Sequence, residues 1–306
     1  MTLTPQLSIQ LITFSSEDSD WSVLLDQACA ADDAGIDRVV VSDHVAFGEN
    51  LDAYGDPSVG GTEGGRQPTG PDGHWLEPMT VLAMIAARTE RVRIGTNILQ
   101  AALRRPAVLA KTAATLDVLS GGRLDLGVGV GWQREEYEVA GLEFDDRGAL
   151  LNETLEVLQH LWTDQTAAHD GEALSFDGIH QMPKPIQTGG VPIWVSGTVN
   201  RRSMDRLARY GQGWIPWGPD AVDVVSGIAA MRSAVSERGR DASEIAVLGN
   251  LPLVRDEGGE PDPVATMAGA GALIDAGVTD LRISLRLGDD RAEVTAQLAA
   301  FVSQMP

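Results

Sequence analysis

The sequence predicts a single (β/α)8 barrel over residues 1–306. Eight short runs rich in β-branched and aromatic residues alternate with eight longer segments of helical spacing, which is the pattern of repeated βα units. The chain length also suits a barrel of this kind. An open, doubly wound sheet is the alternative, but it usually has fewer units and a phosphate-binding glycine motif after its first strand. The sequence has neither feature.

The βα units follow one another in order along the chain. The expected strands cover residues 7–12, 37–43, 92–99, 123–130, 192–197, 213–217, 245–251 and 280–287. The expected helices cover residues 21–34, 77–88, 106–119, 147–161, 201–210, 221–238, 263–276 and 291–302. Several helices end in a glycine just past the last apolar turn, as at Gly35, Gly121 and Gly277, which is typical of helix C-caps.

Two connections are longer than ordinary loops between strands and helices. Residues 46–75 follow the second strand and are rich in glycine and proline, while residues 164–190 precede the fifth strand and contain a hairpin-like stretch. Long loops in compact domains are usually lids, binding loops or disordered segments. The first loop leaves the carboxyl end of its strand, where barrel enzymes keep their active sites. We therefore predict a lid at 46–75, with a functionless insertion as the alternative.

Composition excludes several classes of partner. The net charge of −21, from 44 acidic and 23 basic residues, argues against nucleic acid and anionic membrane surfaces as ligands. The single cysteine, Cys29, excludes an intramolecular disulfide and suggests a reducing compartment. The first residues lack the pattern of a secretion signal, and no segment approaches the roughly 18 consecutive apolar residues of a membrane span. We expect a cytoplasmic protein.

The fourth expected strand ends in an unusual glycine run, GVGVG at 127–131, followed by WQREEYEV. A dinucleotide-binding fingerprint would require glycine at Trp132 or at Arg134, so both possible registers fail. The run instead indicates a buried strand, a turn at Gly131 and a helix that begins near Gln133. Alternating glycines allow close approach of either a neighbouring backbone or a flat ligand, and the residues leave both interpretations open.

Polar residues follow the second strand at the predicted mouth. Asp43 and His44 end the run VVVSDH, directly before the lid. A histidine beside a charge suits proton transfer, although a structural role is the alternative. No metal site is expected, because the other histidines lack metal-ligand spacing. These are His74, His160, His169 and His180.

The fifth strand ends in Ser196, Gly197 and Thr198, just before a helix. Small hydroxyls and a helix N-terminus make a plausible phosphate site. Simple capping of that helix by Thr198 or Asn200 is equally consistent with the sequence.

The eighth strand and three tryptophans supply further candidates. Strict alternation over 280–287 predicts that Arg282, Ser284 and Arg286 face the barrel interior. Arg286, nearest the mouth, could bind an anionic group or pair with a carboxylate. Trp132 and Trp217 could wall a pocket or pack in the outer layer. The candidate substrate contacts are Trp75, Trp217 and Arg286.

The sequence lacks the catalytic residues that several other classes of enzyme require. The sequence has no nucleophile elbow, no phosphate-binding P-loop, and only two lysines, Lys111 and Lys184. Small residues, aromatic walls and one acid–base candidate fit a bound redox cofactor that brings its own chemistry.

Three segments of the chain resemble the luciferase-like monooxygenase superfamily. They are VVVSDHV, VRIGTNILQAALRRPAVLAKTAATLDVLSGGRLDLGVGVGWQREEYEVAG and VPIWVSGTVNRRSMDRLARYGQGWIPW. Within it, the chain is most similar to mycobacterial-type oxidoreductases that use the deazaflavin coenzyme F420. The resemblance implies a (β/α)8 barrel that holds the deazaflavin ring in its mouth and a small organic substrate beside it. It also implies a homodimer.

The resemblance assigns roles to particular positions. Asp43 and His44 match the family's DH after the second strand, which places the histidine near the reactive face of the ring. Asn97 and Ile98 match a position where relatives carry a non-proline cis peptide. The remaining cofactor contacts that it implies are Val130, Gly131 and Trp132 beside the ring, and Ser196, Gly197 and Thr198 at the phosphate end.

The expected activity is hydride transfer between F420 and an unidentified small molecule, with His44 as acid or base. An FMN-dependent monooxygenase of the same barrel family is the first alternative. A relative that binds the cofactor without catalysis is the second.

Overall fold

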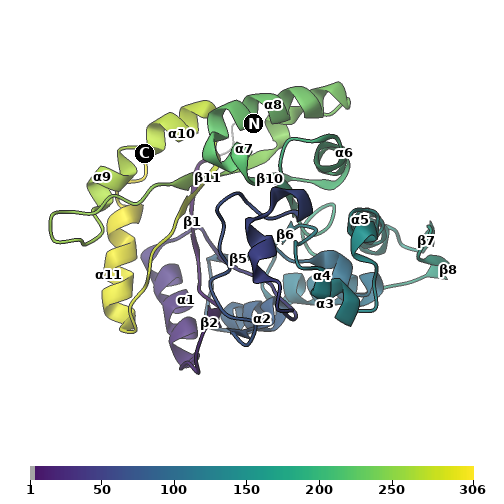
Figure 1. Ribbon diagram of the computed structural model, residues 1–306, viewed down its shortest axis with the longest axis horizontal. Coiled ribbons are helices and arrows are strands. Elements are labelled where there is room, and N and C mark those ends of the chain that lie inside the picture. The colour runs from purple at the N-terminus through teal and green to yellow at the C-terminus, as the bar shows by residue number, and fades with distance from the viewer. Residues whose placement is uncertain (1–3) are drawn as a thin grey trace.

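The computed structural model describes residues 4–306 and contains a closed barrel of eight parallel strands, which confirms the predicted fold (Figure 1). The barrel order is β1-β12-β11-β10-β9-β6-β5-β3, and β3 pairs with β1 to close it. The strands are β1 (Gln6–Gln10), β3 (Arg38–Val41), β5 (Arg93–Thr96), β6 (Leu124–Val128), β9 (Ile193–Gly197), β10 (Gly213–Pro216), β11 (Ala246–Leu251) and β12 (Asp280–Ile283).

Helices surround the strands, as the alternation of the sequence predicts. The longer ones are α1 (Ser22–Ala34), α2 (Pro78–Arg88), α3 (Pro106–Leu119), α5 (Arg147–Thr163), α6 (Arg201–Tyr210), α8 (Val224–Glu237) and α11 (Arg291–Val302). The shorter ones are α4 (Arg134–Val139), α7 (Pro219–Val222), α9 (Pro263–Met267) and α10 (Ala270–Ala276). Within residues 4–306, none is long and apolar enough to cross a bilayer.

Two predicted helices are each divided in the structure. The expected helix at 221–238 is interrupted at Asp223, whose side chain accepts a hydrogen bond from the backbone N–H of Ser226 and so begins α8. The expected helix at 263–276 is divided between α9 and α10, where Gly269 precedes the second helix. Helical spacing alone does not reveal such breaks, because the apolar positions continue across them.

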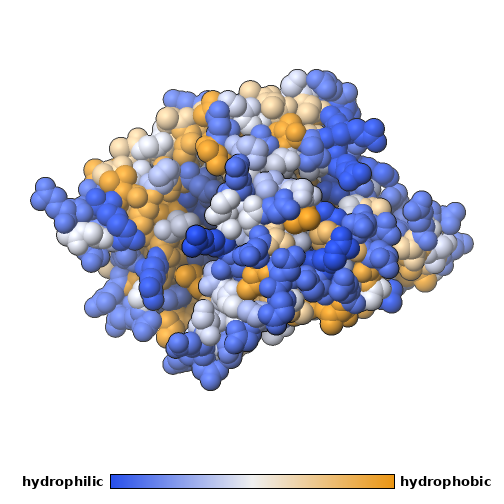
Figure 2. Space-filling model, viewed as in Figure 1, coloured by the Kyte–Doolittle hydropathy of each residue, from blue (hydrophilic) through white to orange (hydrophobic). Residues whose placement is uncertain are grey.

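Two apolar layers hold the barrel together. The larger lies between strands and helices and includes Leu7, Val39 and Leu281. The smaller fills the barrel interior with Trp194, Ile215 and Leu248. Parallel strands are covered on both faces, so apolar side chains on each side are expected. The face of the molecule shown in Figure 2 is mostly hydrophilic, with apolar areas between the polar ones.

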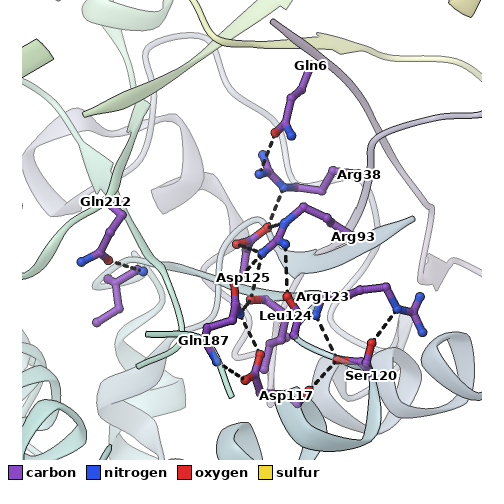
Figure 3. Close-up of polar contacts among 12 residues, drawn as sticks. Gln6, Arg38, Arg93, Asp117, Ser120, Arg123, Leu124, Asp125, Gln187 and Gln212 are labelled. Atoms are coloured by element: carbon purple, nitrogen blue, oxygen red, sulfur yellow. Dashed lines mark hydrogen bonds and ion pairs between the residues drawn. The ribbon is translucent and has the colours of Figure 1, made fainter. Parts of the chain in front are cut away.

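The base of the barrel is filled by a network of paired charges (Figure 3). The carboxylate of Asp125 accepts hydrogen bonds from Arg38 Nε at 2.9 Å and from Arg93 Nη2 at 2.6 Å. Arg38 also pairs with Asp280, and its Nη2 donates to Gln6 Oε1 at 3.0 Å. These residues lie toward the amino ends of their strands, away from the mouth.

Both long connections have the form that the sequence predicts. Residues 46–75 contain the 3-10 turns η1 (Leu51–Gly55) and η2 (Pro57–Val59), and they end in β4 (His74–Trp75), which pairs with β2 (Phe14–Ser15). This loop, indigo in Figure 1, lies at the centre of that view. The second insertion forms the hairpin of β7 (Ala167–Asp170) and β8 (Ser175–Ile179), which projects at the right of Figure 1.

The prediction for the eighth strand is partly wrong. Arg282 faces the interior, where its Nε donates to Ser8 Oγ at 3.1 Å. However, β12 ends at Ile283, and Ser284 and Arg286 are exposed beyond it. The strict alternation continued past the strand because the following loop keeps an apolar residue at every second position, including buried Leu285.

Candidate active site at the barrel mouth

His44 is the central polar side chain of the mouth, and a buried carboxylate holds it. Its Nδ1 lies 3.1 Å from Oε2 of Glu136, which is completely buried, while the His44 side chain is 11% exposed. Glu136 also accepts hydrogen bonds from the backbone N–H of Val45 at 2.6 Å and from Gln100 Nε2 at 2.7 Å. An ionised carboxylate only accepts, so Nδ1 carries the proton and Nε2 is left as a basic nitrogen.

Asp43 has different partners from its neighbour. Its carboxylate accepts two hydrogen bonds from Arg104, at 2.6 and 2.9 Å, and one from the backbone N–H of Gln100 at 2.9 Å. Burial would lower the pKa of Arg104, but Asp43 and Glu77 outweigh it and raise that pKa. Asp43 thus fixes the loop after β5, and the carboxylate that contacts His44 is that of Glu136.

The glycine run supports this arrangement by allowing close contacts. Gly131 has a φ of +70°, and a Cβ there would lie 1.9 Å from Gln100 Oε1, so a larger residue would displace the amide that holds Glu136. Gly129 lies against the side chains of Ile98 and Ser196. The alternating glycines thus join the ends of β5, β6 and β9 at one place.

Aromatic side chains wall the site. The His44 ring lies 4.7 Å from that of Trp75, 4.5 Å from that of Phe47 and 5.8 Å from that of Trp132, measured between centroids. Trp132 is buried, and the ring of Tyr54 from the lid lies 5.4 Å from it. Burial raises the pKa of the Tyr54 hydroxyl.

The loop at 46–75 closes over the turn after β6. Trp217 Nε1 lies 3.2 Å from the carbonyl oxygen of Gly60 and 3.1 Å from that of Gly61. Gly60 in turn packs against the backbone of Gly131. Trp217, Trp75 and Trp132 therefore all belong to the mouth rather than to an outer layer.

The floor of the mouth is apolar, with several polar atoms left without partners. Ile98 packs on the interior cluster of Trp194, Ile215 and Leu248. The peptide bond between Asn97 and Ile98 is cis, as the resemblance implied. Among the described residues, Asn97 Oδ1, Gln100 Oε1 and Trp132 Nε1 are buried without a hydrogen-bond partner. Buried polar atoms normally have partners, so these suit contact with a ligand.

Ser196, Gly197 and Thr198 are half-buried at the end of β9 and lead into α6. Asn200 is the residue that caps this helix, because its Oδ1 accepts from the backbone N–H of Ser203 at 3.0 Å. Thr198 is therefore not needed as the cap. The carboxylate of Asp220 accepts from the backbone N–H of Val199 at 2.7 Å, which removes one donor from this segment.

Val130 lies at the edge of the site, and Arg286 lies outside it. Val130 is half-buried, and its carbonyl oxygen accepts from the Tyr137 hydroxyl at 2.7 Å. Arg286 is exposed and lines a separate groove of about 340 Å³ with Gln10, Trp21 and Asp289. Among residues 4–306 it makes no ion pair, so the alternative of pairing with a carboxylate is not what the structure shows.

Sequence reasoning missed Glu136, Gln100 and Arg104. The signal for Glu136 was its place in the first turn of the helix that follows the glycine turn, where a side chain can reach back to the mouth. Gln100 and Arg104 follow β5 in the same way. Their contacts to Asp43 and Glu136 depend on neighbouring strand ends, which local patterns do not reveal.

The linear spacing of the histidines does not show which of them lie close together in the fold. His160 on α5 and His169 on β7 have ring centroids 6.2 Å apart, although nothing in their spacing along the chain groups them. The hairpin folds back on the helix and brings them together with Glu156. His74 and His180 are not part of this group.

Comparison with known proteins identifies the family. The family model for luciferase-like monooxygenases matches residues 7–261. The chain belongs to the luciferase-like monooxygenase family. An uncharacterised protein of Mycobacterium tuberculosis is 32% identical over 74% of this chain and 76% of its own length. An F420-dependent glucose-6-phosphate dehydrogenase of Segniliparus rotundus is 31% identical over 81% of this chain and 68% of its own.

Solved structures of other proteins have the same fold. An F420-dependent secondary alcohol dehydrogenase, in complex with an F420–acetone adduct, superposes with a TM-score of 0.75 and 17% identity over 99% of this chain and all of the other. The monooxygenase RslO1 of Streptomyces bottropensis has a TM-score of 0.73 and 21% identity over 98% of both chains. At these identities the likeness shows the barrel fold alone.

Proposed function

We propose that this luciferase-like protein is an F420-dependent oxidoreductase that transfers a hydride between the deazaflavin and a small organic substrate. The observation that carries the proposal is His44, held through Nδ1 by the buried Glu136 carboxylate at the wall of an apolar-floored mouth. The relative named as an F420-dependent dehydrogenase supports the choice of cofactor.

The residues of the mouth fit a flat ring with polar edges. Ile98, together with the interior cluster beneath it, offers an apolar support for a ring face. Asn97 Oδ1 and Trp132 Nε1 supply an unpartnered acceptor and donor beside it. Thr198 and the first N–H groups of α6 could hold a phosphate. When bound, the deazaflavin supplies the hydride chemistry.

The chain's own contribution is proton transfer and positioning. Glu136 fixes the His44 tautomer, so Nε2 can accept a proton from a substrate hydroxyl, or return one in the reverse direction. The lid at 46–75, fastened by Trp217, would exclude water from this step. Asp43 acts indirectly. Its carboxylate accepts from the backbone N–H of Gln100, and the Gln100 side chain donates to Glu136.

Cofactor titration tests the proposal. Purified chain is titrated separately with F420 and with FMN, and binding is followed by fluorescence. We expect F420 to bind more tightly, and Trp132→Phe to weaken its binding by up to about tenfold, the value of one hydrogen bond. Tight binding of FMN with no binding of F420 would overturn the choice of cofactor.

The second candidate is an FMN-dependent monooxygenase, favoured by the fold shared with the monooxygenase RslO1. Oxygen uptake in the presence of reduced flavin distinguishes it from a dehydrogenase. A non-catalytic cofactor-binding relative would bind F420 but turn over nothing in a panel of alcohols, aldehydes and enones.

A further inference from the structure

A second group of chemically competent side chains lies outside the barrel, between α5 and the β7–β8 hairpin. Glu156 and His160 are four residues apart on α5 and share one face of it, while His169 comes from β7. One ligand atom from each lies within 4.8 Å of the other two. The three side chains line an open hollow of about 620 Å³. We propose that Glu156, His160 and His169 bind a divalent transition metal such as Zn²⁺.

Each histidine of this cluster is held from behind by a carboxylate. His160 Nδ1 lies 2.8 Å from Asp164 Oδ2, and His169 Nε2 lies 3.2 Å from Glu153 Oε1. This leaves Nε2 of His160 and Nδ1 of His169 as the nitrogens available to an ion. A carboxylate on the far nitrogen is the usual support of a metal-ligating histidine, since it fixes the ring and increases its basicity.

Glu156 can serve as a ligand without losing its present partners. Its Oε1 accepts from Arg209 at 2.9 Å, and its Oε2 lies 3.5 Å from the Tyr210 hydroxyl. A carboxylate has about four lone-pair sites, so it can bind an ion and a donor together.

The ligand set matches zinc chemistry. Two histidines and one glutamate, with water in the fourth position, are a known tetrahedral zinc set, with ligand atoms roughly 3.3 Å apart. The present separation of up to 4.8 Å must therefore shorten. Glu156 and His160 are about one-third exposed and can move, whereas His169 is buried and fixes the position of the ion. Imidazole ligands favour Zn²⁺, Ni²⁺ or Cu²⁺ over Mg²⁺ and Ca²⁺.

An ion here would fasten the hairpin to the barrel. β7 and β8 pair only with each other among the described strands, and an isolated two-stranded hairpin has little stability of its own. The C-terminal half of α5 lies toward the amino ends of the strands, because barrel helices run opposite to them. The site is thus distinct from the mouth, and an ion there would link the hairpin to α5.

The test is zinc binding to the untagged, full-length chain. After metal removal, equilibrium dialysis against Zn²⁺ and elemental analysis should give one tightly bound ion per chain. His160→Ala should weaken binding at least tenfold, and Asp164→Asn about tenfold, the usual effect of losing such a supporting group. The matched control is His180→Ala, which removes a histidine next to the hairpin but outside the cluster and should bind zinc like the wild type.

A second readout follows the hairpin itself. Zinc should slow proteolytic cleavage within 167–179 in the wild type and in His180→Ala, and should not do so in His160→Ala. His160 is partly exposed, so its replacement leaves the fold intact, and circular dichroism checks this. The proposal is overturned if the wild type binds no zinc, or if His160→Ala and His169→Ala bind as much as the wild type.

Discussion

The two ends of the barrel both contain buried charges, but they use them differently. At the base, Asp125 is paired with Arg38 and Arg93 (Figure 3), and Asp280 is paired with Arg38. At the mouth, Asp43 and Glu136 are equally well supplied with donors, yet acceptors and donors next to them remain without partners. The base also has one unpartnered atom, Arg282 Nη1, which is enclosed within the barrel.

This difference separates structure from function within one fold. A network whose carboxylates are all paired with arginines holds the strands in position and has little acceptor capacity left for a ligand. The network at the mouth ends in a histidine nitrogen and in polar atoms that have no partner, so it can still make hydrogen bonds to a ligand. The mouth is therefore where a ligand is expected, and the base is where stability is expected.

The largest expected effect is at the mouth. We expect His44→Ala to lower kcat by about 10²- to 10⁴-fold, the usual contribution of an acid–base group. Affinity for F420 and the urea midpoint should change little. Stopped-flow hydride transfer with a substrate that turns over measures the effect, with His180→Ala as control. Unchanged rates would remove His44 from the chemistry.

At the base of the barrel we expect the opposite result, a loss of stability without a loss of activity. Asp125→Ala leaves the buried Arg38 and the half-buried Arg93 without this carboxylate and should lower the free energy of unfolding by about 3–5 kcal/mol. Urea denaturation measures it, while kcat of the folded fraction should stay near the wild-type value. A large loss of kcat with normal stability would contradict the separation of the two ends.

An intermediate effect is expected for Glu136→Gln. The amide keeps the size of the side chain but no longer offers a charged acceptor to Nδ1 of His44. We expect kcat to fall about 10- to 100-fold, the value of a hydrogen bond to a charged group, with F420 affinity retained. If KM rises and kcat does not change, Glu136 positions the substrate rather than His44.

A smaller effect is expected at the lid. Trp217→Phe removes the N–H that lies near the carbonyl oxygens of Gly60 and Gly61, and should cost about 0.5–1.5 kcal/mol locally. Limited proteolysis within 46–75 should become several times faster, while the global unfolding midpoint moves little. An unchanged cleavage rate would show that the lid is held by its other contacts.

The smallest effect concerns acid stability near the mouth. Burial would raise the pKa of Glu77, but hydrogen bonds from Thr80 and Arg104 outweigh it and hold this pKa below the ordinary value of 4.5. A lowered carboxyl pKa stabilises the fold fully above the unfolded value, and this stability is lost as the pH falls through the folded value. Glu77→Gln should therefore flatten the fall of the urea midpoint below pH 4.5. A fall of the urea midpoint that is as steep in Glu77→Gln as in the wild type would contradict this role of Glu77.

Much of the fold could be predicted because its signals are local. Every expected barrel strand and helix is present, and the hairpin and the loop at 46–75 were both expected. The predictions were wrong where the alternation of apolar residues continued beyond the end of a strand, as after Ile283 in β12. They were also wrong where one residue divided a helix, as at Asp223.

Only some residues of the candidate site could be predicted from the sequence. His44, Trp132 and Ser196 stand at strand ends, so topology alone predicts that they share a mouth. The partners of His44 and Asp43 were not predictable in the same way. Glu136 and Arg104 are separated from them by 92 and 61 positions, and only the lateral order of strands decides that they touch.

By itself the sequence determined the barrel, because periodic apolar runs and glycine caps act over a few residues and need no knowledge of distant contacts. Tertiary structure alone decided which carboxylate holds His44, which charges cancel at the base, and that His160 meets His169. These outcomes depend on close approach between segments far apart in the chain, and their energies depend on burial, which exists only once the barrel has closed.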